Sequence, residues 1–175
     1  IILKVKLFLV YEIILNENLV QLYLDNEKFN HKLLLNDNLH DLIFNTNSLF
    51  NQPIELNDKL ETLTFGNNFN QPIKLNNKLN YLKFRNEFNQ PLKLNASLVD
   101  LEFGNNFNQP IELTNNIHTL IFNTNSLFNQ PIELTNNLGT LTFGNNFNQP
   151  IELNNKLFYL KFGNEFNQPL KLNIS

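Results

Sequence analysis

Apolar residues recur along this chain in units of 19 to 21 residues. Each unit opens on the string Phe-Asn-Gln-Pro, and unit positions are numbered here from its Phe. Full copies of the string start at Phe50, Phe69, Phe88, Phe107, Phe128, Phe147 and Phe166, and degenerate copies start at Leu9 and Phe29. Unit positions 1, 5, 7, 11, 14 and 16 are apolar in nearly every copy. Because a fixed period gives each unit the same surroundings in a stack, these positions predict the interior of a solenoid.

The apolar spacing within a unit predicts one strand and one return segment. Positions 14 and 16 alternate with the variable position 15, which is the period of a half-buried β-strand. Gly at position 17, as in Gly66, permits a turn out of that strand. Pro53 and its equivalents at position 4 start a return segment that cannot be a helix interior, and Ile54 and Leu56 then point inward. The sequence therefore predicts a β-rich solenoid with one long parallel β-sheet and short extended or irregular return segments.

The repeats also set the domain organisation. Residues 1–8 form an N-terminal edge or partial first coil, and residues 9–175 form a repeat array of eight complete units and a partial unit from residue 166. Segments 43–95 and 121–173 lie 78 residues apart and match at 46 of 53 positions. This similarity indicates that a block of four units was duplicated.

Recurrent Phe and Asn residues carry specific structural expectations. Rings at position 1, such as Phe69 and Phe88, are expected to stack in a column through the core. Rings at position 16, such as Phe65 and Phe84, are expected to form a second column. The chain contains 37 Asn, and the Asn at position 2 is expected to form a ladder that satisfies backbone groups of neighbouring turns. Asn at other positions is expected to be an exposed turn former.

Composition and charge exclude several kinds of chemistry. The 175 residues contain no Cys, Met or Trp and three His, with a formal net charge of −3. No disulfide, thiolate nucleophile or zinc–thiolate site is available, and a mild acidic balance argues against nucleic-acid binding. The apolar opening, Ile1–Leu15, is too short for a membrane span and contains charged residues. We expect no cofactor, metal, nucleic acid or membrane partner, and the missing Met indicates a fragment of a longer chain.

The candidate binding surface lies on the exposed strand positions. Unit positions 12, 13, 15 and 17 vary while most others repeat, and the richest stretch is on the fourth and fifth units. The predicted partner-binding residues are Tyr23, Tyr81, Lys83, Arg85, Asp100, Glu102, Tyr159 and Lys161. Tyr and Arg are common anchor residues of interfaces. The alternative is that Lys83 and Glu102 merely form a cross-strand ion pair. Asp100 and Glu102 could form a carboxylate pair, but nothing in the sequence predicts an enclosure, so we do not expect an enzyme.

The unit resembles the FNIP repeat, a leucine-rich-repeat-like unit of amoebae and giant amoebal viruses. The resemblance rests on the pattern L-x-x-L-x-F followed by FNQPI and covers nearly the whole chain. The longer units, at 39–49 and 117–127, also fit the leucine-rich consensus L-x-x-L-x-L-x-x-N-x-L. The family unit usually carries Leu-Pro before its strand, whereas this chain has Leu-Asn-Asn, as at Leu75–Asn77. That departure shortens the coil.

The resemblance implies interaction with other proteins. Such repeats form partner-binding arrays, often C-terminal to an F-box, and residues 1–8 are too few to hold one. We therefore expect a non-enzymatic scaffold that binds a protein partner through the inner sheet face, as the recognition array of a larger F-box-type adaptor. The alternative is a structural protein, for instance of a virus particle, that self-associates through open solenoid ends. The expected location is the cytoplasm, or the host cytoplasm or virion if the source is viral.

Overall fold

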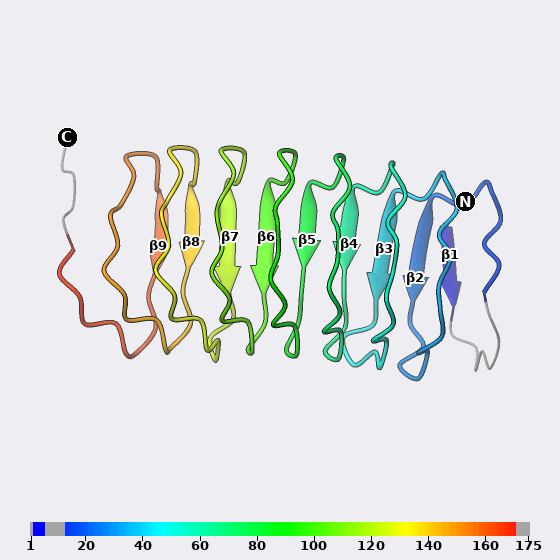
Figure 1. Ribbon diagram of the computed structural model, residues 1–175, viewed down its shortest axis with the longest axis horizontal. Helices are drawn as coiled ribbons and strands as arrows, with labels where there is room; N and C mark the ends of the chain where they lie inside the picture. Colours follow the sequence, from blue (N-terminus) through cyan, green and yellow to red (C-terminus); the bar gives the residue numbers. More distant parts are fainter. Residues whose placement is uncertain (1, 6–12, 171–175) are drawn as a thin grey trace.

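The chain folds as a single stack of coils along one parallel sheet (Figure 1). The computed structural model describes residues 2–5 and 13–170; the expected start of the first unit at Leu9 and the end of the last unit lie outside these ranges. The sheet has nine strands in sequence order, β1 to β9. They span Ile2–Val5, Gln21–Leu24, Asp41–Phe44, Thr62–Thr64, Tyr81–Lys83, Asp100–Phe103, Thr119–Phe122, Thr140–Thr142 and Tyr159–Lys161. The predicted leucine-rich-like β-solenoid is confirmed.

The register places equivalent unit positions beside each other. Leu63 of β4 pairs with Leu82 of β5, and Leu82 pairs with Leu101 of β6. Side chains at positions 14 and 16 are buried, while those at positions 13 and 15 face outward and are partly exposed along most of the sheet. This alternation follows from the pleat of a strand with one face on the core. At the N-terminal end, Leu3 of β1 pairs with Leu22 of β2 in the same register.

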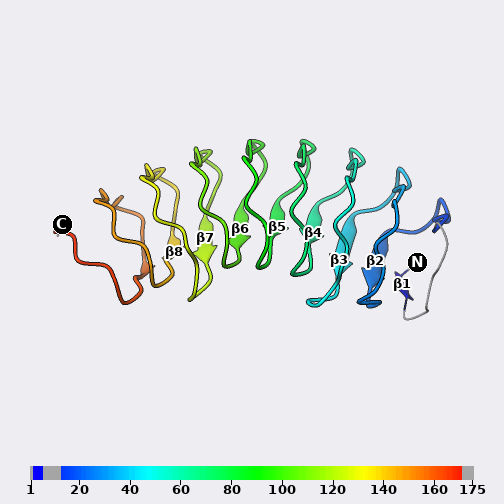
Figure 2. The same cartoon turned by 60° about the horizontal axis from the view of Figure 1, so that its bottom comes forward.

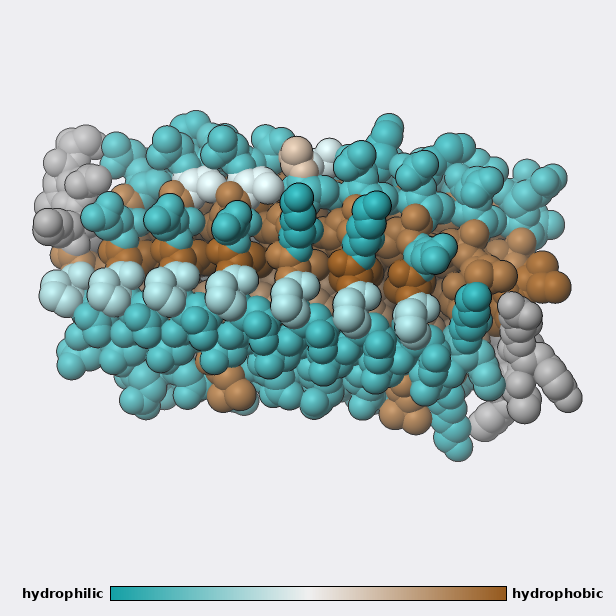
Figure 3. All heavy atoms as spheres, viewed as in Figure 1, coloured by the Kyte–Doolittle hydropathy of each residue, from teal (hydrophilic) through white to brown (hydrophobic). Residues whose placement is uncertain are grey.

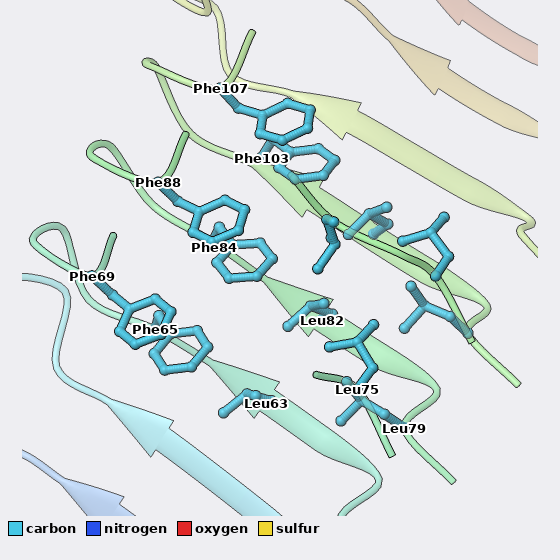
Figure 4. Packing of buried hydrophobic residues seen from close by; sticks show 14 of the residues in the cluster. Leu63, Phe65, Phe69, Leu75, Leu79, Leu82, Phe84, Phe88, Phe103 and Phe107 are labelled. Carbon is cyan, nitrogen blue, oxygen red and sulfur yellow. The ribbon is translucent and has the colours of Figure 1, made fainter. Parts of the chain in front are cut away.

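The Phe rings form two columns that also stack on each other (Figure 4). Phe69 and Phe88, at position 1, have ring centroids 6.2 Å apart and planes 7° apart. Phe65 and Phe84, at position 16, have centroids 5.5 Å apart. Both predicted columns are therefore confirmed. The closest ring contact lies between the columns, because Phe65 and Phe69 have centroids 3.6 Å apart. Parallel stacking buries large apolar rings in contact with their own copies.

The predicted Asn ladder at position 2 is present along the array. Asn89 Oδ1 accepts a hydrogen bond of 2.9 Å from the backbone N–H of Asn108 in the next coil. It also accepts one of 3.2 Å from Gln109 Nε2. The Asn89 N–H donates in turn to Asn70 Oδ1 at 2.9 Å. Each Asn thus satisfies a backbone donor beside the Phe column, where an unpaired N–H would be costly.

A second Asn ladder, at position 8, corrects the expectation that the other Asn residues are exposed turn formers. Asn76 is 8% exposed, and its Nδ2 donates to Leu60 O at 2.9 Å. Its Oδ1 accepts from the backbone N–H of Leu79 at 2.8 Å. Asn95 repeats both bonds one coil later, to Leu79 O and from the Leu98 N–H. The expectation was wrong at this position because the turn before each strand leaves backbone groups inside the stack.

Position 17 also differs from its predicted role. Among the described residues no Gly has a positive φ, so these glycines are not needed for a left-handed turn. They permit close approach of neighbouring coils instead, since a Cβ added at Gly104 would lie 2.2 Å from the carbonyl of Arg85. A Cβ added at Gly66 would lie 2.6 Å from Asn45 O. Gly therefore serves the inter-coil contact at this position.

The array bends gently, and the sheet lies on the inner side of the bend (Figure 2). The strands are closer together along the long axis than the return segments on the opposite face (Figures 1 and 2). On that return face a hydrophobic band runs the length of the molecule between hydrophilic margins (Figure 3). It corresponds to positions 5 and 7, such as the buried Ile111 and half-buried Leu113. The exposed face of the sheet is therefore an inner, concave surface.

In the two longer coils, the spacing of the leucine-rich consensus suggests the wrong residues for the interior. Asn47 and Leu49, which fit the consensus Asn and final Leu, are both exposed. Ser48 is fully buried instead, and its Oγ accepts from the backbone N–H of Phe50 at 3.2 Å. The two additional residues therefore form an outward bulge, and the coil rejoins the common path at the Phe.

Replacing Asn89 by Ala tests the position 2 ladder. The substitution leaves the Asn108 N–H without its acceptor, and we expect a loss of about 1–3 kcal/mol in the free energy of unfolding. Urea unfolding followed by circular dichroism measures this loss. The matched control is Asn77→Ala, an exposed Asn, which should change stability by less than about 0.5 kcal/mol. Equal effects of the two substitutions would contradict a structural role of the ladder.

Candidate functional site

The candidate site is the inner face of the sheet, built from the side chains at positions 13 and 15 of each strand. Strand β5 contributes Tyr81 and Lys83, and strand β6 contributes Asp100 and Glu102. The parallel register pairs Tyr81 with Asp100 and Lys83 with Glu102. Because residues two apart on a strand share a face, the four side chains lie on one side of the sheet. The fold therefore brings together half of the predicted partner-binding residues.

Glu102 is the centre of this cluster. Its Oε2 lies 2.5 Å from Lys83 Nζ, and its Oε1 accepts a hydrogen bond of 2.8 Å from the Tyr81 hydroxyl. Both carboxylate oxygens are thus engaged by the neighbouring strand. The cross-strand ion pair weighed from the sequence is present, so the cluster is internally satisfied and held in one geometry. It presents a tyrosine ring and a lysine stem that are already ordered.

The environment of Tyr81 favours its neutral form. Burial of the hydroxyl raises the pKa of Tyr81 strongly above its ordinary value of 10.0. The hydrogen bond to Glu102 and the negative charge of that carboxylate raise the pKa further. The phenol therefore remains a hydrogen-bond donor throughout the physiological pH range.

Arg85, at position 17, lies close enough to the cluster for its positive charge to oppose the rise in the pKa of Tyr81. It follows β5 in the turn, at the position that Gly104 occupies in the next coil, and is half-buried. Its Nε atom is buried and has no hydrogen-bond partner among the described residues. In the equivalent coils Gly66, Gly104 and Gly144 are buried, so position 17 belongs to the contact between coils. Arg85 is thus at the border of the cluster.

The remaining predicted residues lie three strands away on either side. Tyr23 is half-buried on β2, beside Ile43 of β3. Tyr159 and Lys161 are exposed on β9. At about 4.8 Å per strand, each group is roughly 14 Å from the cluster, so one compact ligand does not contact all of them. The eight residues form separate contact points along an extended surface.

One polar contact of the inner face was missed from the sequence. Gln21 Nε2 donates to Asp41 Oδ2 at 2.5 Å between β2 and β3. Both residues occupy position 13 in adjacent units, so the repeat alignment contained the signal. Adjacent positions that combine a donor and an acceptor predict such cross-strand pairs.

The described residues contain neither a cluster typical of a metal centre nor a helix that could span a membrane. Within residues 2–5 and 13–170, no group of three or more His, Asp or Glu side chains is placed to hold a metal ion. No helix in the same ranges has the length and apolar character needed to cross a bilayer. On the return face, Glu55, Lys74 and Lys93 at position 6 are exposed, as expected for a solvated surface.

Comparisons with known proteins support a repeat fold of this type. A family model described as FNIP Repeat matches residues 128–155. The crystal structure of CroV588, described as a novel circular LRR protein structure, has a TM-score of 0.75 and 39% sequence identity to this chain. The similarity covers 91% of this chain and 26% of CroV588, so the chain spans about a quarter of the length of that protein. No curated protein matches the chain.

Glu102→Gln tests the electrostatic link to Tyr81. The pKa of Tyr81 is higher in the folded chain than in the unfolded chain, so the protonated phenol stabilises the fold. This contribution is complete below about pH 10 and is lost as the pH rises further. In Glu102→Gln the pKa of Tyr81 should fall but stay above its ordinary value, because burial persists. Tyrosinate absorbance during a pH titration measures this, and Tyr81→Phe identifies the contribution of Tyr81. An unchanged titration would contradict the proposed role of Glu102.

Proposed function

The chain is an FNIP-type, leucine-rich-repeat-like solenoid, and on this premise we propose that it is a scaffold that binds a protein partner through the inner face of its sheet. FNIP and leucine-rich-repeat-like folds are typically non-enzymatic interaction scaffolds. The observation that carries the proposal is the ordered cluster on β5 and β6. Tyr81, Lys83 and Glu102 are preorganised there at the middle of a concave surface.

Preorganisation is the physical reason to favour this surface. Binding orders flexible side chains at a cost of about 0.5–1.5 kcal/mol each, and side chains that are already ordered avoid much of this cost. Tyr81 offers a ring face beside a lysine stem, and Asp100 adds a carboxylate on the next strand. Aromatic and charged residues together are typical of interface anchors. Tyr23, Tyr159 and Lys161 then provide secondary contacts for an extended partner.

We propose further that the array is the recognition part of a larger adaptor in the cytoplasm. The chain spans about a quarter of the length of CroV588, which leaves room for other regions in a protein of similar size. An F-box is the partner domain that the family resemblance implies. Catalysis is not part of the proposal, because both carboxylate oxygens of Glu102 are already engaged by Lys83 and Tyr81.

The double substitution Tyr81→Ala/Lys83→Ala tests binding through the inner face. Peptides of twelve residues are selected from a random display library on the wild-type chain, and their affinities are then measured by fluorescence polarisation. We expect the double variant to bind the selected peptides about tenfold more weakly, as for loss of an interface anchor. The matched control is Lys74→Ala/Lys93→Ala on the return face, which should leave the affinities unchanged. Peptides that bind both variants and the wild type equally would count against the inner face.

Self-association is a second candidate function, favoured by the similarity to a protein described as circular. The present chain is curved, and several curved arcs joined end to end could close a ring. A ring of copies would be a structural element and would not depend on Tyr81 or Lys83.

Sedimentation velocity across a concentration series distinguishes the two functions. For a binding scaffold we expect residues 1–175 to remain a monomer at all concentrations. For a structural element we expect discrete larger species that grow with concentration and persist in Tyr81→Ala/Lys83→Ala. Persistent assembly together with equal peptide binding by the wild type and Tyr81→Ala/Lys83→Ala would favour the structural role over the scaffold.

A further inference from the structure

The two duplicated blocks differ mainly at one edge of the molecule. The edge comprises unit positions 9, 10 and 12, in the turn that leads into each strand at the upper side of Figure 1. We number the coils by their units, which start at residues 9, 29, 50, 69, 88, 107, 128 and 147. We call this edge the first rim in coils 1–4 and the second rim in coils 5–8. Segments 43–95 and 121–173 differ at seven of 53 positions, and four of the seven changes lie on the rims. These four are Asp58/Asn136, Lys59/Asn137, Glu61/Gly139 and Asn80/Phe158.

The changes remove acidic charge from the second rim. The first rim carries Glu17, Asp37, Asp58 and Glu61, and the residues at the same unit positions of the second rim are Ala96, Asn115, Asn136 and Gly139. At positions 9, 10 and 12 of coils 5–8, all of which are described, no acidic residue remains. Lys78 is kept as Lys156 and His40 as His118. The second rim therefore has a cation and an imidazole without a carboxylate beside them.

The same changes create an exposed aromatic contact. Phe158 lies on the coil after Gly139, and its ring reaches back to His118 with centroids 5.8 Å apart. This contact needs Gly139, because an added Cβ would lie 2.5 Å from Phe158 Cε1 and 2.9 Å from His118 Cε1. In the first rim the corresponding position is Glu61, whose Oε1 lies 3.3 Å from His40 Nδ1. A contact between a carboxylate and an imidazole in one copy has thus been replaced by an aromatic pair in the other.

An open depression of about 600 Å³ lies beside this aromatic pair. Its lining consists of Val99, Asn115, Asn116, His118, Asn137 and Lys156. The amides on its wall are held by bonds between coils: Asn137 Nδ2 donates to Asn115 O at 2.8 Å, and Lys156 Nζ donates to Asn137 Oδ1 at 2.9 Å. An ammonium group has three donors, so Lys156 can still donate to a ligand. The depression combines an apolar border with one accessible cation.

We propose that the second rim is a separate docking site for a protein segment that carries an apolar side chain next to a carboxylate. The apolar side chain packs on the exposed ring of Phe158, and the carboxylate pairs with Lys156 beside His118. Charge complementarity decides the choice of partner, because the four acidic residues that would repel a carboxylate at the first rim are absent here. The site lies at the starts of the strands, so it adds to the inner face and does not depend on it.

Two synthetic twelve-residue peptides test the proposal. Both contain a central Leu-Phe pair, which is flanked by Glu in one peptide and by Lys in the other. We expect the wild-type chain to bind the Glu peptide at least tenfold more tightly in fluorescence polarisation. Phe158→Asn, which restores the residue of the first block, should weaken this binding about tenfold. Lys156→Gln should reduce the preference for Glu over Lys while part of the apolar contact remains.

Two further variants separate docking from folding. Gly139→Ala displaces the Phe158 ring from His118 without removing either ring, and we expect it to weaken binding of the Glu peptide several-fold. Asn80→Phe places the same ring in the first rim beside Glu61 and should add no binding. Circular dichroism checks that each variant keeps the wild-type unfolding transition. Equal affinity for the two peptides, or wild-type affinity in Phe158→Asn, would overturn the proposal.

The inner-face variant Tyr81→Ala/Lys83→Ala distinguishes this site from the scaffold function proposed above. It should bind the Glu peptide with wild-type affinity, because neither substituted residue lines the depression. A loss of Glu-peptide binding in this variant would place the peptide on the sheet and would overturn docking at the second rim.

Discussion

Every coil of this protein is stacked on a near copy of itself at the spacing of one β-strand. The in-register parallel sheet places each unit position directly beside the same position of the next coil, as in the pairing of Leu63, Leu82 and Leu101. A residue in the interior must therefore make a favourable contact with its own kind. Phe meets this condition because rings stack, and Asn meets it because one amide both donates and accepts. Asn, the most frequent residue of the chain, and Phe, which occurs 17 times, both suit such stacking.

The same constraint decides where function can be encoded. Interior positions cannot vary without disturbing two neighbouring coils, so the variable residues are confined to positions that face solvent. Among the described residues, two of these surfaces are the inner sheet face and the rim before the strand. On the inner face, charged groups of adjacent strands are paired, as Lys83 is with Glu102. On the second rim the acidic partners are missing, and Phe158 packs on His118 across Gly139.

Positions whose environment follows from recurrence were well predicted from the sequence. The columns of Phe69 on Phe88 and the ladder through Asn89 follow from a single argument about stacked copies. The predictions failed where the environment of a residue depended on the direction of its side chain and on its distance from the neighbouring coil. Asn76 was taken as an exposed turn residue, but its amide reaches two carbonyls of the preceding coil. Position 17 was assigned to the exposed face, but Gly66, Gly104 and Gly144 are buried at the contact between coils.

The sequence by itself determined the solenoid, its coil length, its single parallel sheet and the identity of its buried apolar positions, because a strict repeat forces equivalent residues into equivalent environments. Tertiary structure decided the rest. It set the curvature that makes the sheet concave, the pairing of Tyr81 and Lys83 with one carboxylate, and the approach of Phe158 to His118. These features depend on side-chain reach between neighbouring coils and on the space left by a missing Cβ, which residue spacing along the chain does not specify.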